Sequence, residues 1–200
     1  MVGSPVEVFR LACIEAKIEP LASMDGPQAA AVAAKACYEQ IVQERLEEHH
    51  WPFAKWEESL VASGDTVPEP WTYSFVKPAS ILIIHAVRYS GRPLDYEIRR
   101  NRILTRNDTA SVVATWRAAE SEWPATFTGV IVRELAAKLR LAVKKDDQGA
   151  FALEESADMK ARRARVRQKR QQPGKRLVIP RLVQIYLGRN GTPPDSSSDV

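Results

Sequence analysis

The sequence predicts an α+β fold in which a bundle of about four helices carries a small antiparallel β meander between its second and third helices. Apolar residues recur at helical spacing in four segments, and a region rich in β-branched residues and turn signals separates the second from the third. A proline and a glycine at 173–174 then precede an apolar segment that continues neither pattern. We therefore expect one domain over residues 1–172, with the β insertion at about 51–118, and an extended C-terminal arm over residues 173–200.

The first helix is predicted by its capping residues. Ser4 is a helix cap, Pro5 suits the first helical position, and Glu7 completes a capping box. We expect the helix to close at Pro20, because proline cannot continue it. Its apolar stripe is Val8, Leu11, Ile14 and Ile18.

The second helix is expected to open at residues 25–27 and to run to about Glu48. Its alanine-rich start favours close packing against another helix. His49 and His50 follow, where a cationic side chain suits the negative end of the helix dipole. The apolar stripe is Ala30, Ala34, Cys37, Tyr38, Ile41, Val42 and Leu46.

The next region predicts strands. A proline and three aromatic residues at 51–56 indicate an extended, buried segment, and residues 63–71 read as a loop. A hairpin is expected to turn at Arg100 and Asn101. The expected strands are 81–84, 86–89, 94–98, 103–105 and 111–116.

Two further helices complete the domain. Pro124 starts the third helix, and residues 146–149 are expected to break it. The fourth is expected from about Leu153 to Gln171, with Pro173 ending it. The third helix has the apolar stripe Phe127, Ile131, Leu135, Leu139 and Ala142.

Charge is distributed unevenly along the chain. Residues 1–158 hold 18 Lys and Arg against 23 Asp and Glu, whereas residues 159–194 hold 11 Lys and Arg and no acid. A basic run of this kind favours contact with a phosphate backbone or an acidic protein groove. The alternative is a solvated helix end whose cations suit the helix dipole. The basic residues of the fourth helix are Lys160, Arg162, Arg163, Arg165, Arg167, Lys169 and Arg170.

Catalytic motifs are absent from the sequence. It contains no phosphate-binding loop, no G-x-S-x-G, no H-E-x-x-H and no C-x-x-C. His49 and His50 are adjacent and point about 100° apart on a helix, which prevents joint chelation, and His85 reads as a packed strand histidine. We therefore expect a protein that is not an enzyme and that holds no metal or cofactor.

The remaining residue types indicate a soluble chain. No stretch approaches the roughly 18 apolar residues of a membrane helix, and the start does not resemble a signal peptide. Cys13 and Cys37 are expected to be reduced, with a disulfide as the alternative. We expect core anchoring, or burial between subunits, for the tryptophans at 51, 56, 71, 116 and 123.

The order of these segments resembles a known family. An alanine-rich helix is followed by Trp51-Pro52-Phe53-Ala54, by segments at 73–87 and 95–105, and by Pro124-x-x-Phe127 leading to residues 135–139. This combination is similar to the head–tail connector (adaptor) proteins of tailed bacteriophages, which include tail tubular protein A of short-tailed phages and the head-completion adaptors. The resemblance covers roughly residues 25–170, and the basic run and the tail are poorly covered.

The resemblance implies a structural subunit that forms a ring of about twelve copies beneath the portal and continues the DNA channel. Its implied partners are the portal protein, neighbouring copies, a downstream nozzle or tail-completion protein and the genomic DNA in the channel, with no membrane. Its implied location is the head–tail junction of the virion, after synthesis in the host cytoplasm. Our hypothesis is that residues 160–190 dock on the portal. The proposed contacts are Arg162, Arg163, Arg165, Arg167, Lys169, Arg170, Lys175, Arg176, Leu177, Val178, Ile179, Leu182, Ile185, Tyr186 and Leu187.

Two alternatives remain open. A nucleic-acid-binding protein would use the basic helix at 160–176 on phosphates, and it would bind plain duplex DNA with a steep salt dependence. A small regulatory or toxin–antitoxin protein with a basic tail would form a small oligomer and recognise a specific sequence.

Overall fold

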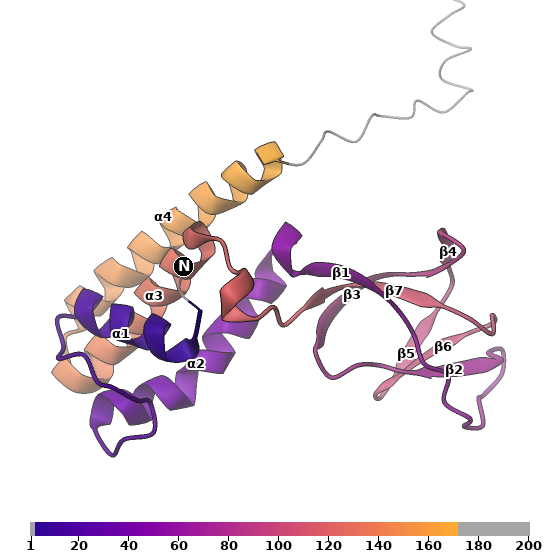
Figure 1. The fold of residues 1–200 in the computed structure, drawn as a ribbon, viewed down its shortest axis with the longest axis horizontal. Helices are drawn as coiled ribbons and strands as arrows, with labels where there is room; N and C mark the ends of the chain where they lie inside the picture. The colour runs from indigo at the N-terminus through magenta and orange to yellow at the C-terminus, as the bar shows by residue number, and fades with distance from the viewer. Residues whose placement is uncertain (1–2, 172–200) are drawn as a thin grey trace, which may run out of the picture. The chain divides into compact units, whose positions relative to one another are not determined.

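The computed structural model describes residues 3–171 of the chain, with side chains for residues 3–168. Residues up to Lys169 form one compact unit. The α+β fold with a β insertion between the second and third helices is confirmed (Figure 1). The arm expected at 173–200 lies outside the described residues. The helices are α1 (Pro5–Glu15), α2 (Ala29–Glu48), α3 (Ala125–Leu139) and α4 (Asp147–Gln171).

Helix α1 starts as its capping residues predict but ends earlier than expected. The Ser4 hydroxyl accepts the Glu7 N–H, and Pro5 occupies the first turn. Lys17 then adopts a left-handed backbone with φ of 57°, and the Ile18 N–H donates to the Cys13 carbonyl at 2.8 Å. This is the geometry of a Schellman motif, which ends the helix before Ile18.

The buried face of α1 also differs from the predicted stripe. Val8, Phe9, Ala12 and Cys13 are fully buried, whereas Ile14 is 60% exposed. Leu11 is exposed as well. The helix is apolar on two sides, and its packing against α3 decides which side is buried.

The helical core lies where α1, α2 and α3 meet. The stripe predicted for α2 is buried except for the half-buried Cys37, and neither cysteine is in a disulfide. Leu46 of α2 and Phe127, Ile131 and Leu135 of α3 are fully buried. The Trp51 ring stacks edge-on to Phe127, with centroids 5.0 Å apart.

The segment at 51–56 is not the continuous extended, buried run that we expected. Trp51 is buried, and its indole N–H donates to the Arg45 carbonyl at 2.6 Å, but a 3₁₀ turn follows at Pro52–Ala54. Strand β1 (Lys55–Ser59) then leaves the core with every residue exposed, including Trp56. Trp51 therefore anchors the segment in the core, and Trp56 does not.

The strands of the insertion form two antiparallel sheets rather than a sequential meander. One sheet has the order β1-β7-β3-β4 and the other β2-β6-β5. Among the described strands, only β3–β4 and β5–β6 join strands that are neighbours in sequence, and the second of these hairpins turns at residues 100–101 as predicted. The remaining bounds are β2 (Tyr73–Val76), β3 (Ile81–Tyr89), β4 (Arg92–Leu94), β5 (Glu97–Arg99), β6 (Arg102–Thr105) and β7 (Ser111–Trp116).

A second hydrophobic core fills the space between the two sheets. Phe75 and Ile103 come from one sheet, and Val87, Val112 and Ala114 come from the other. These residues form a cluster distinct from the helical core. The insertion therefore has apolar packing of its own.

Helices α3 and α4 meet at a tighter break than predicted. Helix α3 continues through a π turn (Arg140–Lys144) and stops at Lys145, whose φ is 52°. Asp146 then starts α4, because its carboxylate accepts the Gly149 N–H at 2.9 Å and its carbonyl accepts the Ala150 N–H. The fourth helix consequently begins at Asp147, several residues before Leu153. Of the stripe predicted for α3, only Ala142 is exposed.

Candidate interaction surfaces

Helix α4 packs on the bundle through small residues. Ala150, Ala157, Ala161 and Ala164 are buried and recur at helical spacing on one face. Alanines allow a helix to approach its neighbour closely, and they leave the long side chains of α4 for the other faces. The basic residues therefore occupy the rim and the outer side of this helix.

The structure separates the basic residues of α4 into two groups. Arg162, Arg163 and Arg167 are exposed, and none of them is in an ion pair within the described part of the chain. Arg165 instead points toward α2, where its guanidinium pairs with Glu48 at 2.5 Å. Arg165 thus holds α4 to the bundle and is less available to a partner than the hypothesis assumed.

Other members of the proposed docking set lie beyond the described side chains. Lys169 and Arg170 lie on α4, beyond the last described side chain. The remaining proposed docking residues lie outside the described part of the chain. These are Lys175, Arg176, Leu177, Val178, Ile179, Leu182, Ile185, Tyr186 and Leu187.

A charge network around Arg45 joins three helices. The Arg45 guanidinium contacts Glu48 of α2 at 2.7 Å, Asp158 of α4 at 2.6 Å, and Glu134 of α3. Arg45 and Glu134 are only 15% and 17% exposed. Burial raises the pKa of the Glu134 carboxyl, whereas hydrogen bonding to Glu134 raises the pKa of Arg45 and keeps it charged. The network fixes the position of α4 on the bundle.

A basic cavity of about 370 Å³ lies between the start of α3 and the second half of α4. Ala125, Thr126 and Ala164 contribute its uncharged lining, and Lys160, Arg163 and Arg167 contribute three cations. No acidic residue of the described chain lines it. Burial lowers the pKa of the Lys160 ammonium, and the nearby Arg133 lowers it further. The arrangement favours an anionic group over a neutral one.

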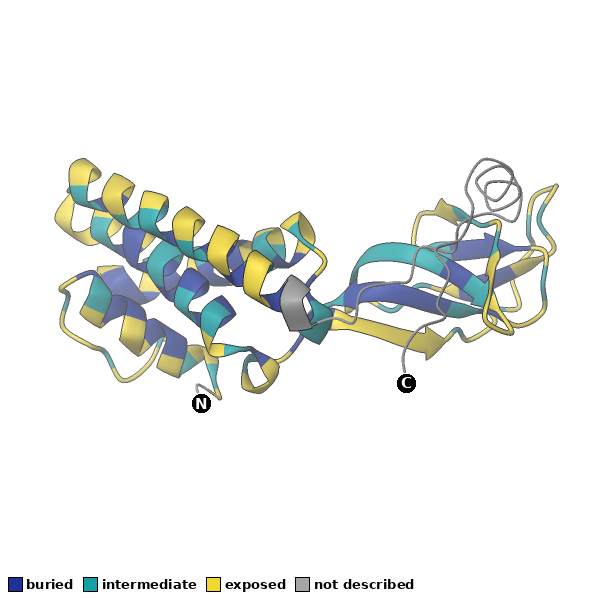
Figure 2. Ribbon diagram, turned by 90° about the horizontal axis from the view of Figure 1, so that it is seen from above, coloured by how far each residue is buried: buried dark blue, intermediate teal, exposed yellow. Residues whose placement is uncertain are grey.

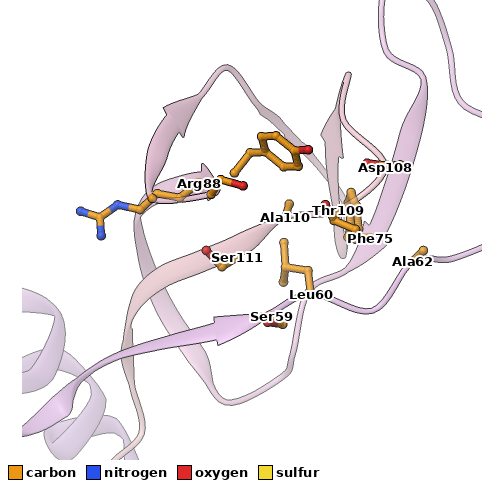
Figure 3. Close-up of a pocket in the computed structure, with 12 residues that line it drawn as sticks. Ser59, Leu60, Ala62, Phe75, Arg88, Asp108, Thr109, Ala110 and Ser111 are labelled. Carbon is orange, nitrogen blue, oxygen red and sulfur yellow. The ribbon is translucent and has the colours of Figure 1, made fainter.

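A larger cavity, of about 520 Å³, lies in the β insertion (Figure 3). Its lining includes the hydroxyls of Ser59, Thr109 and Ser111 and the carboxylate of Asp108. The Arg88 side chain projects away from the other labelled residues, and its guanidinium pairs with Glu57 at 3.2 Å. Neither histidine nor cysteine is among the described residues that line this cavity, so its hydroxyls have no neighbouring imidazole base there.

The histidines lie where the helices and the insertion meet. His49 is the C-terminal cap residue of α2, as its position in the sequence predicts. His85 shares a hydrogen bond of 2.8 Å with the Thr115 hydroxyl, which confirms the expectation of a packed strand histidine. The His50 ring contacts His85 edge-on, with centroids 4.2 Å apart. Burial lowers the pKa of His85, and His50 and Lys55 lower it further.

A second charge cluster, around Arg117, had no signal in the sequence. The Arg117 guanidinium binds Glu39 of α2 at 2.8 Å and Glu120 at 2.6 Å, and it lies over the Trp123 ring. The Tyr38 hydroxyl donates to Glu120 at 2.9 Å, and burial raises its pKa. Glu39 and Arg117 are 78 positions apart, so only the folded chain reveals the pair. This cluster joins α2 to the segment that follows β7.

Metal sites and membrane spans are not found among the described residues. No group of three or more His, Cys, Asp or Glu side chains there could hold a metal ion. No helix in that part of the chain is both long and apolar enough to cross a membrane. No protein-family model matches the sequence, and no curated protein matches it either.

Proposed function

We propose that the chain is a structural head–tail connector subunit of a tailed bacteriophage, which assembles as a ring under the portal and joins the capsid to the tail. The observation that carries the proposal is the ordered set of elements over residues 25–170. An alanine-rich helix, a tryptophan-anchored turn, a β insertion and a proline-started helix follow one another in the order on which the sequence resemblance rests. The proposed location is the head–tail junction of the virion.

The charge arrangement supports a docking role. Arg45, Arg165 and their acidic partners hold α4 against α2 and α3, so the exposed Arg162, Arg163 and Arg167 are carried on a supported helix. Cations presented in this way steer a partner of opposite charge and set its orientation. Residues 172–194, which follow α4, hold more basic and apolar residues and no acid. We propose that they extend the contact with the portal.

A chain ending at Gln171 tests the docking role. This truncation keeps the residues of both cores and removes the proposed apolar anchors at 177–187. We expect it to remain folded, as judged by circular dichroism, and to lose most of its binding to the portal protein. Normal portal binding by the folded truncation would overturn the proposed role of the arm. Loss of helical signal would call for a longer truncation point, such as Lys175, before binding is compared.

A nucleic-acid-binding protein is the second candidate. The observation that favours it is the basic cavity, where Lys160, Arg163 and Arg167 lie together without an acidic neighbour in the described lining. If phosphate contact is the function, the free protein binds duplex DNA of any sequence. The logarithm of its association constant for DNA then falls linearly with the logarithm of the salt concentration. The connector proposal instead predicts weak DNA binding by the free subunit. A DNA titration at two salt concentrations distinguishes them.

A further inference from the structure

The outer face of α4 carries an exposed stripe of three apolar and two charged residues. Phe151, Met159 and Val166 are 68%, 50% and 54% exposed, although all three are large apolar residues. Glu155 and Arg162 are exposed as well. At about 100° per residue, these five positions fall within about 80° of the helix circumference. Figure 2 shows exposed positions along this helix.

The stripe lies opposite the face that packs on the bundle. The buried residues of α4, which include Ala157, Ala161 and Ala164, are about half a turn away from it around the helix. No other element of the described chain therefore covers the stripe. Isolated exposed apolar residues are common on protein surfaces, but a line of them along one helix is typical of a helix–helix interface.

Two copies of the stripe that run in opposite directions place complementary residues opposite each other. A second α4 placed antiparallel, with the two-fold axis between Asp158 and Met159, brings each residue opposite the one equally far from that centre. Phe151 then faces Val166, and Glu155 faces Arg162. By the same rule Met159 lies opposite Asp158 of the second copy, so the two Met159 side chains flank the axis. The apolar contact and the charge pair each occur twice, as an isologous interface requires.

We propose that the free protein forms an antiparallel, two-fold dimer through this stripe, with a second copy of the same chain as the partner. The inference comes from the α4 face alone and does not rest on the connector role. The stripe is about 24 Å long, and such a short helix pair buries less than the roughly 1,200 Å² of a stable standard interface. The dimer is consequently weak and reversible, and it masks Arg162 from any other partner while it persists.

Charge reversal provides a direct test, read by sedimentation velocity of the full chain over a range of concentrations. The wild type should pass from monomer to dimer as concentration rises. Glu155→Arg places two arginines opposite each other at both charged contacts of the interface, and Arg162→Glu does the same with two glutamates. We expect each single variant to raise the dissociation constant at least about tenfold.

Mixing the two single variants provides the decisive experiment. The Glu155→Arg chain has an arginine at both charged positions of the stripe, and the Arg162→Glu chain has a glutamate at both. In a mixed dimer every arginine therefore faces a glutamate, so an equimolar mixture should recover dimers that neither variant forms alone. The double variant Glu155→Arg with Arg162→Glu should dimerise like the wild type. Val32→Glu changes an apolar residue on α2 that is 57% exposed, and it should leave the dimer unaffected.

Three results would overturn the proposal. The first is a wild-type chain that stays monomeric at every concentration. The second is a dimer or larger ring that both single reversals leave intact, because the contact would then use another face. The third is a mixture of folded single variants that remains monomeric. Circular dichroism of each variant verifies that loss of association is not loss of folding.

Discussion

Arg45 determines how three helices meet, because one guanidinium contacts acids of α2, α3 and α4. A buried carboxylate is costly unless a cation or hydrogen-bond donors compensate it. Glu134 is compensated through one oxygen, while its other oxygen is buried without a hydrogen-bond partner among the described residues. Loss of Arg45 would therefore leave the largely buried Glu134 carboxylate without its cation.

Replacing Arg45 by methionine should destabilise the fold by about 2–4 kcal/mol, somewhat less than a fully buried pair because both side chains keep some contact with water. Urea unfolding followed by circular dichroism measures this change. Arg45→Met combined with Glu134→Leu should recover part of the loss, since no unpaired carboxylate remains. Lys35→Met breaks the exposed pair with Asp25 and serves as the control, with an unfolding midpoint near the wild-type value. An unchanged midpoint in Arg45→Met would contradict this account.

His85 should make stability depend on pH. Its pKa is lower in the folded chain than in the unfolded chain, because burial and then the neighbouring His50 and Lys55 disfavour its protonated form. A group whose folded pKa is depressed contributes stability that is fully present above its unfolded pKa. That contribution is lost as pH falls from the unfolded pKa through the folded pKa. We expect the wild type to lose more stability between pH values of about 7.5 and 5.5 than His85→Gln does. Equal losses in urea unfolding at the two pH values would refute this prediction.

At the scale of elements, the insertion and the helices have separate hydrophobic cores. Ile103 is fully buried between the two sheets, and Leu135 is fully buried in the helical core. Ile103→Ala and Leu135→Ala should each cost about 2–5 kcal/mol. Hydrogen exchange should localise the effect of Ile103→Ala to the strands and leave the amides of α2 and α3 protected. Faster exchange throughout the helices in Ile103→Ala would instead show a single cooperative core.

Local signals predicted some element boundaries, whereas the end of α1, the start of α4 and the long-range contacts could not be predicted. The start of α1 at Pro5 and the span of β7 follow from capping, proline and β-branched residues, which act over a few positions. Strand order and the Arg45 network depend on residues far apart in sequence. Sequence reasoning missed β2, because its four residues lie beside a loop without a marked alternation. It also missed that Asp146 starts α4 by capping it.

The candidate surfaces were predictable only in outline. The basic run showed that α4 carries positive charge, but not which arginines face outward. That distinction depends on the buried alanines, which turn Arg165 toward Glu48 and leave Arg162 and Arg163 exposed. The self-complementary stripe likewise required the structure, because it is defined by the half of the helix that remains uncovered.

For the whole molecule, the exposed arginines of α4 should control the rate at which the chain associates with the portal protein. Arg163→Glu with Arg167→Glu reverses two exposed charges without touching the Arg45 network. We expect the association rate with portal protein to fall about tenfold at low salt and the difference to shrink at high salt. Arg92→Glu with Arg100→Glu makes the same charge change on the insertion and is the matched control. Equal rates for the two double variants would refute the steering role.

Native mass spectrometry of the chain, with and without portal protein from the same genome and at two salt concentrations, tests the connector proposal most directly. The account predicts a portal-dependent complex that contains one copy, or nearly one, for each portal subunit. The result that would contradict it is the absence of any complex with the portal, together with salt-sensitive binding to added duplex DNA. That outcome would favour a nucleic-acid-binding protein instead.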